Sequence, residues 1–382
     1  MVLKTRFYYS RINFVTLFNY VAICLFLARA IFGNVEFLYL AMLVGLAIFL
    51  IQFLEQGKLP PLVVAFLMII ILSYLITFTN NGVSVGALFI PLNLAHIGVA
   101  WRISTHGLNY QFSRIIFFGS IGYFLYCVLI DDLNPSQIFA NSRNYISVYF
   151  LNTLSILYIS IYLSRDLDFT KLRVLTPALF VFLVSVIAIG SSGIISTFIL
   201  LSLTGMFFLK RSQILVLAFL LLVTISYIAN WDTFISILST FELLSFDPEL
   251  LQKMDYVQLT QENARYYIWD EYINSMNVMR VLSGISLSES FYGFNNYHNS
   301  FILLHARLGF FSFIIALMFF VSIIRGFKVN IILASCLFAI LLRSFGDTSI
   351  LAGSAFDFVI FYFIFFLHRI KLDKTKAYKS YS

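Results

Sequence analysis

His298 and Asn299 stand where a long polar segment gives way to an apolar run, and both side chains can do chemistry. A histidine at a boundary between water and lipid changes its charge near neutral pH, so it suits work as a general base. Asn299, or Ser300 after it, can cap a helix that begins at this point. The alternative for His298 is a structural role in which hydrogen bonds hold the ring.

The apolar run that follows His298 carries three further residues of interest. If the run is helical from His298 onward, His305 lies two turns further along the same stripe. Gly309 falls on that stripe as well, and its lack of a side chain lets a neighbouring element pack closely. Arg307 faces nearly the opposite way.

Arg265 and Trp269 form a second group in the polar segment upstream. Trp269 belongs to a stripe with Tyr266, Ile273 and Met276 at helical spacing, which predicts an amphipathic helix over residues 262–282. Gly284 is a plausible stop for this helix. The stripe fits a face that packs against the protein, and it also fits a platform for a sugar.

The composition decides which elements must position these residues. Of 382 residues, 60% are hydrophobic and 11% are charged, whereas soluble domains carry about 25% charged residues. An ordinary cytosolic enzyme, a disordered chain and a nucleic-acid-binding domain are therefore excluded. The basic residues flank apolar runs, as they do in membrane proteins. The sequence predicts an all-α, polytopic integral membrane protein.

About twelve apolar runs can cross the roughly 30 Å hydrocarbon core as helices. They are residues 14–32, 36–54, 61–78, 83–101, 115–131, 145–163, 173–190, 193–209, 213–230, 299–324, 329–343 and 350–368. Residues 1–230 thus hold spans one to nine, 231–297 form a large extracytoplasmic loop, 298–368 hold the last three spans, and 369–382 form a basic tail. If the N- and C-termini are both cytoplasmic, most Lys and Arg residues lie on the cytoplasmic side of the membrane. The sequence therefore predicts that topology.

Several arginines lie instead at outer helix ends, in outer loops or within the membrane. They include Arg29, Arg143, Arg265, Arg307 and Arg343. The planar guanidinium can grip a phosphate through two parallel hydrogen bonds, so this grouping favours an anionic substrate on the outer side. The alternative is that single side chains reach out to lipid phosphates. Because no metal-binding pattern occurs, we expect neither a metal nor another cofactor.

The two polar motifs resemble those of the bacterial O-antigen polymerase and O-antigen ligase superfamily (Wzy- and WaaL-type membrane glycosyltransferases of the GT-C class). Arg265 followed four positions later by Trp269 matches the element in that family's large periplasmic loop. His298 and Asn299, with Gly309 further on, match the second element.

The resemblance has departures as well as matches. Ser312 stands where the family has Gly, Thr or Tyr, and the Arg143-Asn144 pair resembles polymerase sequences. The family often has an arginine near the short outer turn between the seventh and eighth spans. This chain has residues Ser191–Gly193 there, which leaves open which arginine takes that place.

The resemblance implies a reaction on the outer face of a bacterial inner membrane. The donor is a glycan on undecaprenyl pyrophosphate, and a sugar hydroxyl of a second lipid-linked repeat attacks its anomeric carbon. His298 is then the candidate base, and Arg265 stabilises the departing pyrophosphate. The candidates for binding pyrophosphate or glycan are Arg143, Arg343, Arg307, Arg29, Asn299 and Trp269. Further expected partners are membrane lipid and a chain-length regulator of the Wzz type, but no nucleic acid.

Two alternatives to the polymerase remain open at this point. The ligase transfers finished chains to lipid A–core by the same chemistry, and the resemblance of Arg143-Asn144-Tyr145 favours the polymerase over it. A lipid flippase or transporter would need no chemistry. Its candidate charges within the membrane are Asp357, His96 and Arg307.

Overall fold

The computed structural model describes residues 14–139, 143–164, 168–188, 191–208, 267–286, 289–291, 297–346, 348 and 354–365. These residues form helices and connecting turns and contain no extended β-strand. The expected all-α fold class is confirmed for this part of the chain. The expected span 213–230, most of the expected loop 231–297 and the basic tail 369–382 lie outside the described residues.

Five helices are long and apolar enough to cross a membrane. They are α1 (Phe14–Phe32), α2 (Val35–Gln56), α4 (Tyr110–Leu129), α5 (Arg143–Leu163) and α13 (Phe311–Val329). The shorter helices α6 (Lys171–Ile187), α7 (Ser191–Phe208) and α14 (Ile331–Phe345) match three further expected spans. Residues 357–365, within the last expected span, are helical too. The chain is a membrane-embedded protein, and the count of about twelve spans stays a prediction.

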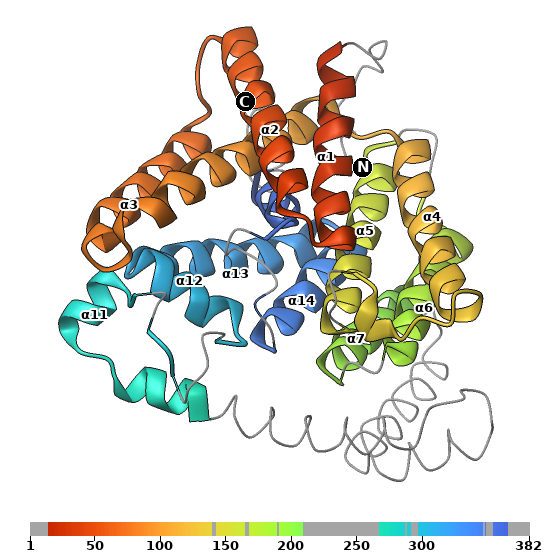
Figure 1. Cartoon of the computed structure of the whole chain (residues 1–382). Coiled ribbons are helices and arrows are strands. Elements are labelled where there is room, and N and C mark those ends of the chain that lie inside the picture. Colours follow the sequence, from red (N-terminus) through yellow and green to blue (C-terminus); the bar gives the residue numbers. More distant parts are fainter. Residues whose placement is uncertain are drawn as a thin grey trace.

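The expected spans 61–78 and 83–101 lie in one helix, α3 (Pro61–His106, 46 residues). A straight helix of this length would measure about 69 Å, more than twice the hydrocarbon core. Figure 1 shows α3 as two arms that meet in a bend. Pro91 lies inside the helix and cannot donate a backbone hydrogen bond. The two expected spans are thus parts of one bent helix, and Pro91 lies within the second of them.

The expected span 299–324 is divided into α12 (Ser300–Leu308) and α13 (Phe311–Val329). Gly309 ends α12 with φ 54° and donates its N–H to the His305 carbonyl at 2.8 Å. The next N–H, of Phe310, turns away and donates to the Leu282 carbonyl at 3.1 Å. With only nine residues, α12 is about 14 Å long and cannot cross a bilayer by itself.

The amphipathic helix expected over residues 262–282 is interrupted as well. Residues 267–274 are helical, and α11 (Val278–Ser283) begins after a short turn. Asn277 causes the restart, because its side chain accepts a hydrogen bond from the Arg280 N–H at 2.9 Å. The expected stop at Gly284 is confirmed, with φ 75° and an N–H that bonds the Arg280 carbonyl.

Helix α5 is the centre of the described bundle, and nearly all its residues are buried. It packs against α4, α6, α7 and α14. Polar side chains join it to its neighbours: the Tyr158 hydroxyl donates to the Val174 carbonyl at 2.6 Å, and the hydroxyls of Tyr149 and Ser120 lie 2.7 Å apart. Because these groups are paired, a helix with many hydroxyls can be buried within a membrane protein.

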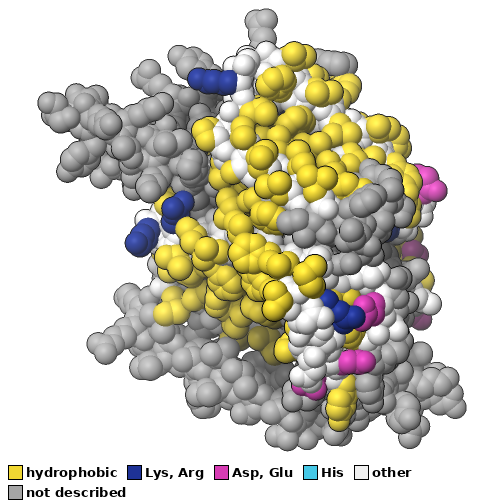
Figure 2. Space-filling model, turned by 90° about the vertical axis from the view of Figure 1, so that its left-hand side faces the viewer, with side chains coloured by type: hydrophobic (Ala, Val, Ile, Leu, Met, Phe, Trp, Pro, Cys, Tyr) yellow, Lys and Arg dark blue, Asp and Glu magenta, His cyan; other side chains and the backbone are white. Residues whose placement is uncertain are grey.

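The outward-facing side chains are largely apolar, as lipid requires. Figure 2 shows one face as a broad hydrophobic surface with charged side chains at its margins. On α2, the exposed fractions of Leu43, Leu50 and Leu54 are 59%, 58% and 76%. In water such a surface would be a large aggregation liability, whereas lipid contact makes it favourable.

Candidate functional site

Asn299 caps α12 and also ties this helix to α14. Its side-chain oxygen accepts hydrogen bonds from the N–H groups of Phe301 and Ile302 at 2.9 and 3.2 Å. Its amide nitrogen donates to the Phe345 carbonyl at 3.3 Å, in the last turn of α14. The expected cap is confirmed, and a single side chain holds the two helix ends together.

His298 lies just before this cap, half-buried and outside the helix. Its φ of 48° is in the left-handed region, which few residues other than glycine occupy. The expected stripe that would align His298 with His305 is therefore wrong, because the helix begins only at Ser300. Left-handed conformations of this kind concentrate at functional sites.

Trp269 is joined to the residue before His298. Its indole Nε1 donates to the Tyr297 carbonyl at 2.8 Å. Trp269 packs beside a small apolar cluster that includes Ile268, Tyr272 and Tyr297. The buried face of this helix is thus set by Ile268 and Tyr272, whereas Ile273 of the expected stripe is 64% exposed. These contacts favour the packing interpretation of the aromatic stripe.

Tyr297 brings a buried hydroxyl to the same place. Burial, helped by the negative charge of Glu289, raises the pKa of Tyr297 to about 12, so the phenol is neutral at physiological pH. Its hydroxyl is buried and makes no hydrogen bond with any described residue. Buried polar groups are normally paired, so an unpaired hydroxyl marks this position as unusual.

His305 has a structural role. Its Nδ1 lies 2.6 Å from the Tyr272 hydroxyl, and its Nε2 lies 3.1 Å from the Val281 carbonyl. With both ring nitrogens engaged, His305 fastens residues 267–274 and α11 to α12.

Arg343 is buried in the last turn of α14, with an exposed fraction of 1%. Its Nε donates to the Ser147 hydroxyl of α5 at 2.9 Å. A Cβ at Gly346 would meet Ser192 at 2.9 Å and the Arg343 guanidinium at 3.6 Å, and a Cβ at Gly193 would meet the Ser147 hydroxyl at 2.6 Å. Arg343 is therefore the described arginine beside the turn that leads into α7.

Arg307, in the last turn of α12, is half-buried. Its guanidinium carbon lies 5.7 Å from the centroid of the Phe89 ring. Its charge interacts with Asp357 and Tyr297. Asp357 is fully buried and accepts a hydrogen bond from the Ser354 N–H at 3.0 Å. A half-buried arginine and a buried carboxylate thus interact electrostatically among apolar helices.

The remaining predicted residues do not join this group within the described chain. Arg29, half-buried in the last turn of α1, makes no hydrogen bond or ion pair with a described residue of the group. Arg143 begins α5, but its side chain lies outside the described residues, and Arg265 lies outside them altogether. No cluster suited to a metal occurs in the part that the structure describes.

Ser147 is the contact residue that the sequence did not reveal. A serine in the first turns of an apolar helix has no local signal that distinguishes it from the other serines of α5, such as Ser155 and Ser160. Those two hydroxyls bond carbonyls of their own helix, whereas Ser147 accepts from Arg343. The comparisons with known proteins found no family model and no curated protein that matches this chain.

Proposed function

We propose that this protein is a bacterial inner-membrane glycosyltransferase of the GT-C class that polymerises oligosaccharide repeat units linked to undecaprenyl pyrophosphate. The product is a surface polysaccharide, O-antigen or capsule. In this proposal about twelve spans place both termini in the cytoplasm and the active site on the outer face. The reaction uses no metal, and a Wzz-type regulator sets the chain length.

The observation that carries the proposal is the hydrogen bond from Asn299 to the Phe345 carbonyl. It holds the His298-Asn299 motif against the helix end that carries buried Arg343. A candidate base and a candidate phosphate-binding cation, far apart in sequence, thus lie on two helix ends that this hydrogen bond joins. Tyr297, the residue before His298, has a buried hydroxyl that would supply a further donor if substrate reaches it.

The chemistry follows from the charge that develops. As the acceptor hydroxyl attacks the anomeric carbon, His298 takes its proton and the carbon–oxygen bond to pyrophosphate breaks. Arg265 and Arg343 stabilise the negative charge on the leaving group. Ser147 holds the Arg343 guanidinium in place beforehand, so little reorganisation is needed. Removing one such donor typically costs about 3 kcal/mol in barrier, or roughly 100-fold in rate.

The test compares polysaccharide made by cells that carry only H298A, R265A or R343K. We expect each variant to lose long chains while its membrane level stays normal. R325Q is the control, because Arg325 lies in α13 away from this junction. Normal long chains from H298A and R265A together would refute the proposal.

The ligase is the nearest alternative. Deleting the gene for this protein distinguishes the two functions. Loss of a polymerase leaves single repeats on the lipid A–core, whereas loss of a ligase leaves the core bare. The Arg143-Asn144-Tyr145 resemblance is the reason for placing the polymerase first.

One structural observation favours a candidate of another class, a flippase or transporter. Asp357 and His96 are fully buried, His96 stacks on Phe26 with ring centroids 4.3 Å apart, and Arg307 interacts with Asp357. Charges buried between apolar helices are typical of substrate pathways. D357N would then abolish flipping of labelled lipid in vesicles by the purified protein. A D357N variant that still flips lipid would exclude this role.

A further inference from the structure

A hollow of about 690 Å³ lies between α4, α5 and α6, away from the junction described above. The first turns of α4 and α6 line it on two sides, together with Leu157 of α5 and Ser164, which follows that helix. On the expected topology it opens at the cytoplasmic surface. Its volume is within the range of sites for small ligands, roughly 300–1,000 Å³.

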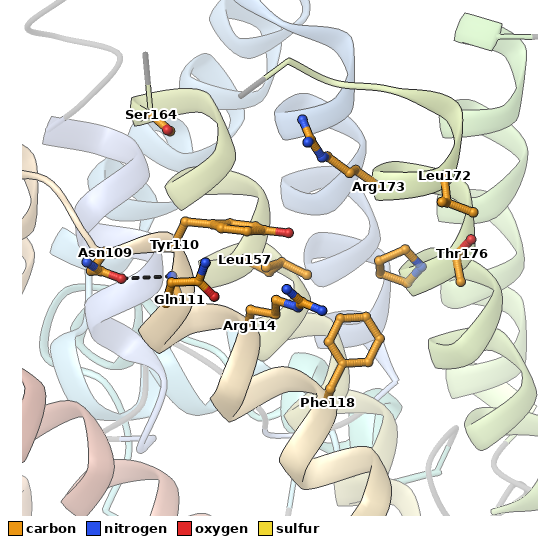
Figure 3. Close-up of a pocket in the computed structure, with 11 residues that line it drawn as sticks. Asn109, Tyr110, Gln111, Arg114, Phe118, Leu157, Ser164, Leu172, Arg173 and Thr176 are labelled. Carbon is orange, nitrogen blue, oxygen red and sulfur yellow. Dashed lines mark hydrogen bonds between the residues drawn. The ribbon is translucent and has the colours of Figure 1, made fainter. Parts of the chain in front are cut away.

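Two arginines line the hollow from opposite walls, Arg114 on α4 and Arg173 on α6. In Figure 3 the Tyr110 hydroxyl points into the space between them. Arg173 donates to the Asp168 backbone carbonyl at 3.4 Å, and Arg114 forms no ion pair with a described residue. Both guanidinium groups thus lie in the lining of the same hollow.

The positive charge of the hollow comes from these side chains and not from the end of α4. The N–H groups of Gln111 and Phe112 there already donate to the Asn109 side chain, at 2.8 and 3.2 Å. Two guanidinium groups on facing walls can bind the oxygens of one phosphate in a forked geometry.

Part of the lining of the hollow is apolar, and this apolar part continues onto the exposed surface of α4 and α6. Phe118, Leu157 and Pro177 line it. Leu172, which also lines the hollow, and Ile115, the residue after Arg114, are 76% and 71% exposed. The Phe118 and Phe180 rings, 6.5 Å apart, close the gap between α4 and α6 deeper in the bundle. A ligand that fits both parts has an anionic head and an apolar body.

We propose that this hollow binds the phosphate headgroup of an anionic membrane lipid, with Arg114 and Arg173 on the phosphate and the acyl chains along α4 and α6. The Tyr110 hydroxyl and the side chains of Gln111 and Thr176 hydrogen-bond the rest of the headgroup. The site is separate from the outer junction and does not depend on the reaction proposed there. A soluble phosphate compound could use the same guanidinium groups, but it would leave the apolar part unused.

The test uses the full chain in detergent, titrated with phosphatidylglycerol or phosphatidylcholine, with lipid adducts measured by native mass spectrometry. We expect one tightly held phosphatidylglycerol. Losing a charge-assisted contact weakens binding by about 10-fold, so the R114Q/R173Q double variant should lose this adduct. T176W fills the hollow without changing its charge and should lose the adduct too. R325Q, which changes a charge outside the hollow, should retain it.

Three outcomes would overturn the proposal. The first is a double variant that binds phosphatidylglycerol like the wild type while its melting temperature is unchanged. The second is T176W retaining the adduct, because binding would then be a general effect of surface charge. The third is displacement of the lipid by an excess of inorganic phosphate, which would assign the site to a soluble phosphate compound.

Discussion

Arg343 and Ser147 lie 196 positions apart in sequence, yet the Arg343 Nε donates to the Ser147 hydroxyl at 2.9 Å. The contact joins the end of α14 to the beginning of α5, the central helix. It orients a fully buried cation at the place where α7 begins. The Ser147 hydroxyl thus helps to fix the direction of this guanidinium.

S147A should therefore weaken both stability and activity. A hydrogen bond to a charged group contributes about 1.5–3 kcal/mol, so we expect a lower melting temperature in detergent and shorter glycan chains in cells. The matched control is S335A, because the Ser335 hydroxyl bonds only the Ile331 carbonyl of its own helix. Equal effects of the two variants would show that Ser147 does not position Arg343.

Asn299 has two separable tasks, and two variants distinguish them. N299D keeps the cap of α12 but loses the donor to the Phe345 carbonyl, whereas N299A loses both. Loss of a cap costs about 1 kcal/mol, so N299A should melt lower than N299D. If the link to α14 positions the site, both variants should lose polymer to a similar degree. Full polymerisation by N299D would show that the link to α14 is dispensable.

Position 309 requires glycine for two reasons: the backbone conformation there, and the atoms that a Cβ would meet. A Cβ there would contact the Leu282 carbonyl oxygen, and its φ is 54°. We expect G309A to lower the free energy of unfolding by more than about 1 kcal/mol. G119A is the control: a Cβ at Gly119, within α4, has no neighbour within 4 Å. Because alanine favours helix, G119A should be neutral or stabilising. A melting curve of G309A identical to the wild type would refute the strain argument.

The Tyr272–His305 contact should be worth a measurable amount of stability. Y272F removes the hydroxyl that lies 2.6 Å from the His305 Nδ1 and leaves that nitrogen buried without its partner. The expected cost is about 1–3 kcal/mol in thermal unfolding. Y39F provides the comparison, because Tyr39 is 42% exposed on α2. A loss no greater than that of Y39F would mean that the ring packing alone holds these segments.

The sequence by itself determined the fold class and many helix ends. Apolar runs of sufficient length predict helices whatever surrounds them, because lipid leaves no other way to satisfy the backbone. The bounds of α1 match the predicted span, and Asn299 caps α12 as its residue type suggested. The helix end at Gly284 could also be predicted from local sequence, because that position needs a positive φ, which glycine adopts readily.

The tertiary structure decided what local pattern could not. The break at Gly309 depends on the Leu282 carbonyl, which accepts the N–H of Phe310. The burial of Ile268 and Tyr272 instead of Ile273 depends on α12 packing against their helix, and the partner of Arg343 is set by the packing of α14 on α5. In each case the deciding group belongs to a segment distant in sequence, and hydrophobic periodicity contains no information about such neighbours.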